Sequence, residues 1–192
     1  MLAVVGLGNP GKQYEMTRHN MGFLVLETLA QMYGVEFRND SRFEGWRTKV
    51  GGVELLLPAT YMNESGRAVQ KLLRYFQIIP GKVLVVVDDM DLPFGQMRLK
   101  AFGGSGGHNG LKSLELHLGT KHFARLRIGI GRPDRSSQVD YVLGGFSKDE
   151  LLALPALRDQ AASYIKRLFK EDLARVANDV NGVKLKEDKE NV

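Results

Sequence analysis

His19 is the side chain in this 192-residue sequence whose type and position best suit general-base chemistry. It lies in the polar segment Thr17-Arg-His-Asn20, directly before residues with helical hydrophobic spacing. An unperturbed imidazole titrates at about pH 6.5 and can therefore accept a proton near neutral pH. A histidine at the start of a helix also serves as a cap or a surface residue, so its position alone leaves both roles open.

Asp88 is the carboxylate best placed to orient such a base. It ends Lys82-Val-Leu-Val-Val-Val-Asp88, a run that predicts a central strand covered on both faces, where a charge needs a partner. A carboxylate on one imidazole nitrogen leaves the other nitrogen free to accept a proton. Asp89 and Asp91 also suit a magnesium site, but neighbouring strand residues point to opposite faces. We therefore favour the His19–Asp88 pair, with no metal and no other cofactor.

Three asparagines lie at separate strand ends or in the loops beyond them: Asn9, Asn63 and Asn109. Ligand sites in sheets of parallel strands gather at the carboxyl ends of the strands. Each amide offers two donors and an acceptor without adding charge. One asparagine in a loop usually serves turn chemistry. Three around a histidine–aspartate pair predict a site that recognises a peptide-like group and polarises a carbonyl.

Two glycine motifs match site signatures but lack their context. Gly6-x-Gly8-x-x-Gly11 follows a first strand, as in dinucleotide-binding proteins, yet residues 10–13 predict a turn instead of a helix. Gly103-x-Ser105-x-Gly107 has the spacing of a nucleophile elbow, which requires an aspartate and then a histidine after the serine. The first aspartate after Ser105 is Asp134, and no histidine lies beyond His122, so this order cannot be completed. We interpret both as loops, and a dinucleotide-dependent oxidoreductase is the weakest alternative.

The hydrophobic pattern predicts the elements that must position these side chains. Strands are expected over residues 2–7, 43–50, 53–58, 82–88, 97–102 and 125–130, and helices over 18–33, 65–76, 108–117 and from 147 onward. The alternation favours a single α/β domain over residues 1–192, with a mixed, mostly parallel twisted sheet and helices on both faces. Residues 147–180 form a C-terminal helical segment that Pro155 should break, and residues 183–192 form a frayed tail.

The composition favours a cytoplasmic protein with a phosphate-rich partner. The absence of cysteine excludes disulfides, zinc–cysteine sites and cysteine nucleophiles. No secretion signal is evident, and no apolar run approaches the roughly 18 residues of a membrane span. Residues 95–135 carry eight basic residues against Glu115 and Asp134, which accounts for the whole excess of +5 in the chain. A clustered basic face favours nucleic acid, although a well-solvated surface has the same composition.

Six blocks of sequence resemble the bacterial-type peptidyl-tRNA hydrolases. They are Gly6-Leu-Gly-Asn-Pro-Gly-Lys-Gln-Tyr14, Thr17-Arg-His-Asn-x-Gly22, Pro58-Ala-Thr-Tyr-Met-Asn-Glu-Ser-Gly66, Asp88-Asp-Met-Asp-Leu-Pro93, Gly106-Gly-His-Asn-Gly-Leu111 and Arg125-Leu-Arg-Ile-Gly-Ile-Gly131. The blocks appear in the order of the family and cover roughly residues 1–146. The tail matches only as a helical segment.

The resemblance implies roles for individual residues. His19 would be the catalytic base, Asp88 its orienting acid, and Asn9 would help to distinguish blocked from free aminoacyl ends. Met62 would shape the pocket, and Tyr61 stands where some relatives have phenylalanine, so its ring matters more than its hydroxyl. Substrate contacts would come from Tyr14, Tyr61, Asn63 and Asn109, and tRNA phosphate contacts from Lys100, Arg127 and Arg132.

The implied activity is hydrolysis of the ester between tRNA and a peptide or N-blocked amino acid, by histidine-activated water without metal. It recycles tRNA during translation. A non-catalytic RNA-binding module is the main alternative, because the basic segment alone would also support it. We expect peptidyl-tRNA as the partner, no membrane, no obligate protein partner, and a monomer.

Overall fold

The fold is that of a computed structural model, which describes residues 1–133 and 137–183. Seven strands of these residues form one sheet in the order β2-β3-β4-β1-β5-β7-β6. The central strands β4, β1, β5 and β7 are parallel, whereas β2, β3 and β6 pair antiparallel at the edges. The strands are β1 (Ala3–Gly6), β2 (Arg38–Asp40), β3 (Gly45–Val50), β4 (Val53–Pro58), β5 (Val83–Asp89), β6 (Met97–Lys100) and β7 (Ala124–Gly129).

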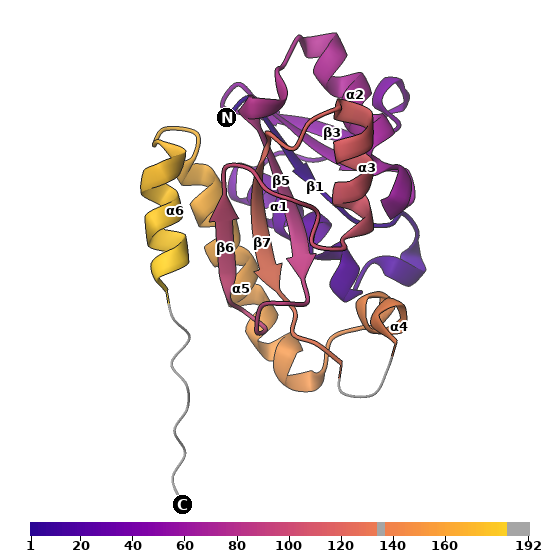
Figure 1. Cartoon of the computed structure of the whole chain (residues 1–192), viewed down its shortest axis with the longest axis vertical. Coiled ribbons are helices and arrows are strands. Elements are labelled where there is room, and N and C mark those ends of the chain that lie inside the picture. The colour runs from indigo at the N-terminus through magenta and orange to yellow at the C-terminus, as the bar shows by residue number, and fades with distance from the viewer. Residues whose placement is uncertain (134–136, 184–192) are drawn as a thin grey trace, which may run out of the picture.

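Helices cover both faces of the sheet, as predicted (Figure 1). They are α1 (Met21–Met32), α2 (Ser65–Phe76), α3 (Asn109–Leu118), α4 (Gln138–Leu143), α5 (Lys148–Arg167) and α6 (Leu173–Gly182). Alternate residues of β5 serve the two faces: Leu84 and Val86 pack with α1 and α5, and Val85 packs with α2 and α3. The mixed α/β prediction is confirmed.

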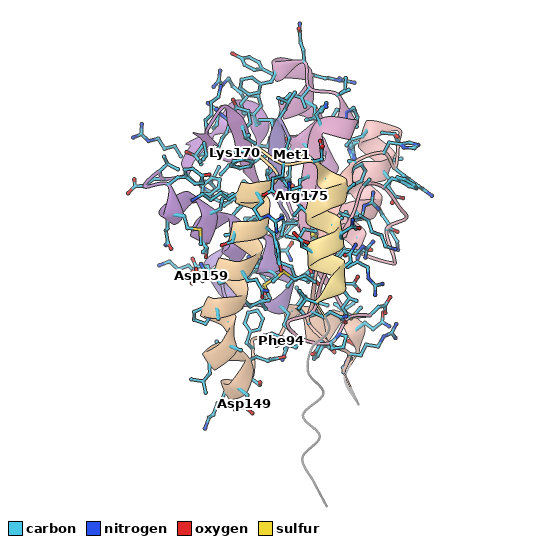
Figure 2. All side chains as sticks on the ribbon, turned by 90° about the vertical axis from the view of Figure 1, so that its left-hand side faces the viewer. Met1, Phe94, Asp149, Asp159, Lys170 and Arg175 are labelled. Atoms are coloured by element: carbon cyan, nitrogen blue, oxygen red, sulfur yellow. The ribbon has the colours of Figure 1, made fainter. Side chains whose placement is uncertain are left out.

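The carboxyl ends of the parallel strands lie at one end of the molecule. The arrowheads of β5 and β7 point toward the end at which α4 lies (Figure 1). Figure 2 looks onto α5 and α6, and Asp149 near the start of α5 lies toward this same end, while Met1 and Lys170 lie at the other. No described helix combines the length and the apolar character that a membrane span requires.

The prediction that Pro155 breaks the C-terminal helix is wrong. Helix α5 continues through this residue. Pro155 is exposed, so water can satisfy the carbonyl that loses its partner, and the buried Leu154, Leu157 and Ala161 hold the helix on the sheet. The interruption comes instead at residues 168–172, before α6. Residues 184–192, most of the predicted frayed tail, lie outside the described residues.

Two short elements escaped the prediction. The edge strand β2 has only three residues, and α4 has six. The signal for α4 is present in the sequence, because the Ser137 hydroxyl accepts a hydrogen bond from the Asp140 amide at 3.1 Å as a helix N-cap. The hairpin prediction is confirmed, with Gly51 and Gly52 at φ 55° and 86° between β3 and β4.

Gly22 lets the start of α1 lie directly on the sheet. A methyl group at Gly22 would lie 2.4 Å from the nitrogen of Leu7 and 2.4 Å from the oxygen of Val86, both backbone atoms. Side chains normally keep helix and sheet farther apart, since they fill the space between them. The absent side chain therefore brings the segment before α1, including His19, within reach of the end of β5.

Replacing Gly22 with alanine should destabilise the protein by about 3 kcal/mol, because the backbone of β5 and of the residue that follows β1 must move to admit one methyl group. The free energy of unfolding from urea titration measures this change. Gly182→Ala is the matched control: no atom lies within 4 Å of its added methyl group, and we expect no loss of stability. Equal stability of the two variants would contradict the close-approach argument.

Candidate active site

A single carboxylate oxygen of Asp88 binds two imidazoles. His19 Nδ1 lies 2.9 Å and His108 Nε2 lies 3.1 Å from Asp88 Oδ1. The centroids of the two rings are 5.0 Å apart. Asp88 is only 3% exposed and His19 is 9% exposed, so the charge of the carboxylate is satisfied by protein donors and not by bulk water.

These contacts fix the protons of both histidines. An ionised carboxylate only accepts hydrogen bonds, so His19 Nδ1–H and His108 Nε2–H must both donate to Asp88. His108 Nδ1 in turn accepts the Leu111 amide at 3.3 Å, which requires an unprotonated nitrogen and agrees with this tautomer. The neutral His19 ring therefore keeps a lone pair on Nε2, the arrangement that a general base needs.

Each member of the His19–Asp88 pair favours the charged form of the other. Burial acts to raise the pKa of Asp88, but attraction to His19 and His108 and their hydrogen bonds hold it well below its usual range. Burial acts to lower the pKa of His19, but the charge and hydrogen bond of Asp88 outweigh burial and raise this pKa above its usual value. His19 is thus a stronger base than an isolated imidazole.

Three elements meet to build this arrangement. Asp88 lies at the carboxyl end of β5, and His19 lies in the 3₁₀ turn η2 (Arg18–Asn20) that leads into α1. His108 is the N-cap of α3, where its ring receives the Leu111 amide. The predicted contact between His19 and Asp88 is present, whereas the participation of His108 was missed.

The histidine pair borders a cavity of about 180 Å³. Asn109, Arg127 and Arg132 line it together with His19 and Asp88, and α4 contributes Gln138, Val139 and Val142. A cavity at the carboxyl ends of parallel strands is where ligand sites are expected in this class of sheet. Of the predicted site residues, this cavity brings together the base, its acid, one amide and two cations.

Asn9 is anchored on the other side of the histidine segment. The backbone N–H of Asn9 donates to Asn20 Oδ1 at 2.8 Å, and the backbone carbonyl of Asn9 accepts from Asn20 Nδ2 at 3.0 Å. The side-chain Oδ1 of Asn9 accepts the backbone N–H of Met62 at 2.8 Å. The Nδ2 donor of Asn9 is the part of the amide left for a ligand. Asn9, Asn20 and Trp46 line a neighbouring cavity of about 570 Å³.

The remaining predicted contact residues differ in exposure. Met62 is buried in η4 (Met62–Glu64), where a methyl group on Gly110 would approach its sulfur to 2.5 Å. Asn63 of the same turn is exposed, and Tyr61 is 58% exposed. Tyr14 is half-buried at the end of η1 (Lys12–Tyr14). The three asparagines therefore do not line one common cavity: Asn109 lines the cavity of His19, Asn9 lines the neighbouring one, and Asn63 lines neither.

The acids beside Asp88 are paired with arginines. Asp89 binds Arg127 Nη1 at 3.2 Å, and Asp91 binds Arg132. The alternative of a magnesium site formed by Asp88, Asp89 and Asp91 is therefore not favoured, because each carboxylate already has a cationic or N–H partner. Among the described residues, a single group is compact enough for a metal, and it contains neither Asp89 nor Asp91: the ligand atoms of His19, Asp88 and His108 lie within 4.8 Å of one another, joined by hydrogen bonds.

The expectation that residues 95–135 form one basic face is only partly right. Arg125 is fully buried, and it donates to the carbonyls of Gly103 and Gly104 and to those of Lys121 and Phe123. Burial and repulsion from Arg127 lower the pKa of Arg125 to about 10.

Arg127 also donates to the Gly104 carbonyl, at 2.8 Å. The two arginines thus hold the glycine-rich loop that leads to His108. Charge counting could not reveal this inward direction. Lys100 and Arg132 are exposed, as expected, while Asp134 and Arg135 lie outside the described residues.

The comparisons with known proteins decide the family. The model of the family described as peptidyl-tRNA hydrolase matches residues 3–189. The chain belongs to the peptidyl-tRNA hydrolase family. A peptidyl-tRNA hydrolase of Parasynechococcus marenigrum (strain WH8102) is 46% identical over 189 residues, or 93% of each chain.

Other members of the peptidyl-tRNA hydrolase family agree in sequence and fold. The protein of that name from Azoarcus sp. (strain BH72) is 48% identical over 172 residues, 88% of this chain and 79% of its own. The crystal structure of peptidyl-tRNA hydrolase from Acinetobacter baumannii has a TM-score of 0.88 and 41% identity, and covers 96% of both chains. The resemblance and the fold predicted from the sequence are both confirmed.

Replacing Asp88 with asparagine should lower the pKa of His19 below about 6.5, because burial remains and the opposing charge is lost. NMR titration of the His19 ring measures this shift. Asp159→Asn, an exposed acid on α5 labelled in Figure 2, should leave the His19 titration unchanged. An unaltered His19 pKa in Asp88→Asn would show that the carboxylate does not set the strength of the base.

Proposed function

We propose that the chain hydrolyses the ester bond between the peptide and the tRNA of peptidyl-tRNA, with His19 as general base and Asp88 as its orienting acid. The observation that carries this proposal is the shared carboxylate, which leaves His19 Nε2 unprotonated beside the cavity. Family membership supports the substrate and the reaction class.

The reaction follows from the proton positions. His19 Nε2 takes a proton from water while the water oxygen attacks the ester carbonyl, and the resulting imidazolium is stabilised by the Asp88 charge. The tetrahedral intermediate then breaks its bond to the ribose oxygen, which receives the proton from His19. The products are a peptide carboxylic acid and tRNA with a free ribose hydroxyl. This sequence needs no covalent nucleophile and no metal.

Neutral amides serve the acyl side of the substrate in this proposal. The free Nδ2 of Asn9 donates to a carbonyl of the blocked amino-acyl end, which an unblocked end lacks. Asn109 stabilises the oxygen of the attacked carbonyl, because it lines the cavity beside His19. Tyr14, Tyr61 and Asn63 contact the peptide or terminal nucleotide, and Met62 shapes the wall between Asn9 and α3.

Cationic side chains serve the tRNA side. We assign phosphate contacts to Lys100 and Arg132, both exposed, and to Arg127, which would also keep its hydrogen bond to the glycine-rich loop. Phosphate contacts position the substrate without reading sequence, which suits an enzyme that acts on many tRNAs. We further propose that residues 1–192 act as one domain, as a monomer in the cytoplasm.

Replacing His19 with alanine should lower kcat for N-acetyl-aminoacyl-tRNA hydrolysis by about 10³-fold, since the base is lost while the cavity persists. Release of the acylated amino acid, with and without a chelator, measures this effect. His122→Ala, an exposed histidine before β7, is the control and should retain activity. Wild-type turnover excludes the alternative of a non-catalytic RNA-binding module, and activity that the chelator abolishes would contradict the metal-free mechanism.

Replacing Lys100 with alanine should raise KM roughly fivefold and reduce the salt dependence of tRNA binding by about one released counterion, with kcat unchanged. Binding measured over a series of salt concentrations gives the slope. Lys170→Ala removes an exposed lysine in the turn after α5, labelled in Figure 2, and should change neither value. Identical slopes for the wild type and Lys100→Ala would remove Lys100 from the tRNA surface.

A further inference from the structure

Arg18 joins the segment that carries His19 to the two elements that follow β7. Its guanidinium donates from Nη1 to the Gly145 carbonyl at 2.6 Å and from Nη2 to Glu150 Oε2 at 2.7 Å. It also lies over the Tyr141 ring, 4.3 Å from the centroid. The side chains of Arg18 and Glu150 are only 11% and 14% exposed, so their ion pair is partly shielded from water and stronger than a surface ion pair.

The backbone reinforces the same junction. The Arg18 amide donates to the Gly144 carbonyl at 3.0 Å, and Thr17 forms an isolated antiparallel bridge with Gly145. Glu150 Oε2 also accepts the Ser147 amide at 2.6 Å, as part of the capping box of α5. The end of α4, the start of α5 and the turn before α1 thus converge on one guanidinium.

Helix α4 depends on such anchors. It has six residues, far fewer than the roughly 12 that an isolated helix needs for even marginal stability. Val142 is its one buried residue, and the Tyr141 hydroxyl donates to the Ile130 carbonyl at 2.6 Å. Arg18 adds a charge-assisted attachment at the carboxyl end of the helix, where a cation is favourable.

The position of α4 matters because the helix forms a wall of the catalytic cavity. Gln138, Val139 and Val142 line the same space as His19 and Asp88. Gln138 and Val139 are otherwise exposed, so they are available to a bound substrate. Nothing in the reaction assigned to His19 uses Arg18, whose contacts lead to α4 and α5.

We propose that Arg18 is a positioning residue that holds α4 as the substrate-contacting wall of the catalytic cavity. The proposal rests on the function proposed above, because the wall matters only if the cavity binds the ester. The cavity binds the acyl-nucleoside end of the substrate, because the ester bond must reach His19. Arg18 therefore acts through α4 and makes no contact with the reacting atoms.

The test compares Arg18→Met, Arg18→Lys and Glu150→Gln with the wild type. Arg18→Met should raise KM for N-acetyl-aminoacyl-tRNA on the order of tenfold, with kcat and the acid limb of its pH profile unchanged, because His19 keeps Asp88. Glu150→Gln should raise KM in the same direction. Arg18→Lys should recover only part of the loss, because an ammonium cannot stack on Tyr141 and bridge two acceptors together.

Arg167→Met is the matched control. Arg167 lies on α5, as Glu150 does, and binds Glu171 and Asp179 at the end of this helix remote from Arg18. This variant should lose stability without a change in KM. Hydrogen exchange over α4 supplies a readout independent of activity, and it should quicken in Arg18→Met but not in Arg167→Met.

Three results would overturn the inference. One is a fall in kcat with a shifted acid limb in Arg18→Met, which would mean that Arg18 acts on His19. Another is a KM and α4 exchange no different from those of Arg167→Met. The third is full recovery by Arg18→Lys. A wild-type protein that leaves the ester intact would instead refute the proposed function, while the exchange data would still test the anchoring of α4.

Discussion

The need to satisfy one buried carboxylate organises this molecule. Asp88 is almost inaccessible to water, and an ionised group in that position is costly unless donors surround it. Its donors come from His19 and His108, which lie 69 and 20 residues away in the sequence. The central strand, the turn before α1 and the cap of α3 must therefore all be in place at once.

The same requirement couples stability to pH. The pKa of His19 is raised on folding, so its contribution to stability is complete below about pH 6.5 and is lost as the pH rises through the folded value. The pKa of Asp88 is lowered, so its contribution is present above about pH 3.9 and is lost on acidification through the folded value. The pair thus stabilises the fold most over the interval between these limits, and the neutral, active form of His19 appears above it, as the pH rises through the folded pKa of His19.

The fold and the central pair could be predicted because they follow from local pattern. His19 was chosen for its type and its position before a helix, and the apolar run before Asp88 predicted a buried carboxylate that needs a partner, which joined the two. His108 escaped because a histidine after a glycine-rich loop carries no sign of whether it caps a helix, binds a carboxylate or does both. Arg125 escaped for a related reason: composition counts a charge but gives no direction, and this guanidinium turns inward to hold loop carbonyls. The predicted helix break at Pro155 was wrong because the effect of a proline depends on whether the carbonyl that loses its hydrogen bond faces water, which the sequence does not reveal.

The charges around the cavity are balanced more evenly than the basic sequence suggests. Arg127 and Arg132 line the cavity but are paired with Asp89 and Asp91, so neither adds a free positive charge next to His19. An unpaired cation there would oppose formation of the imidazolium on which the proposed reaction depends. The exposed Lys100 lies on the edge strand β6, where it can attract phosphates without that effect. In the proposed function, Arg127 and Arg132 contact phosphates while still paired with Asp89 and Asp91, so tRNA binding does not require an unpaired cation beside His19.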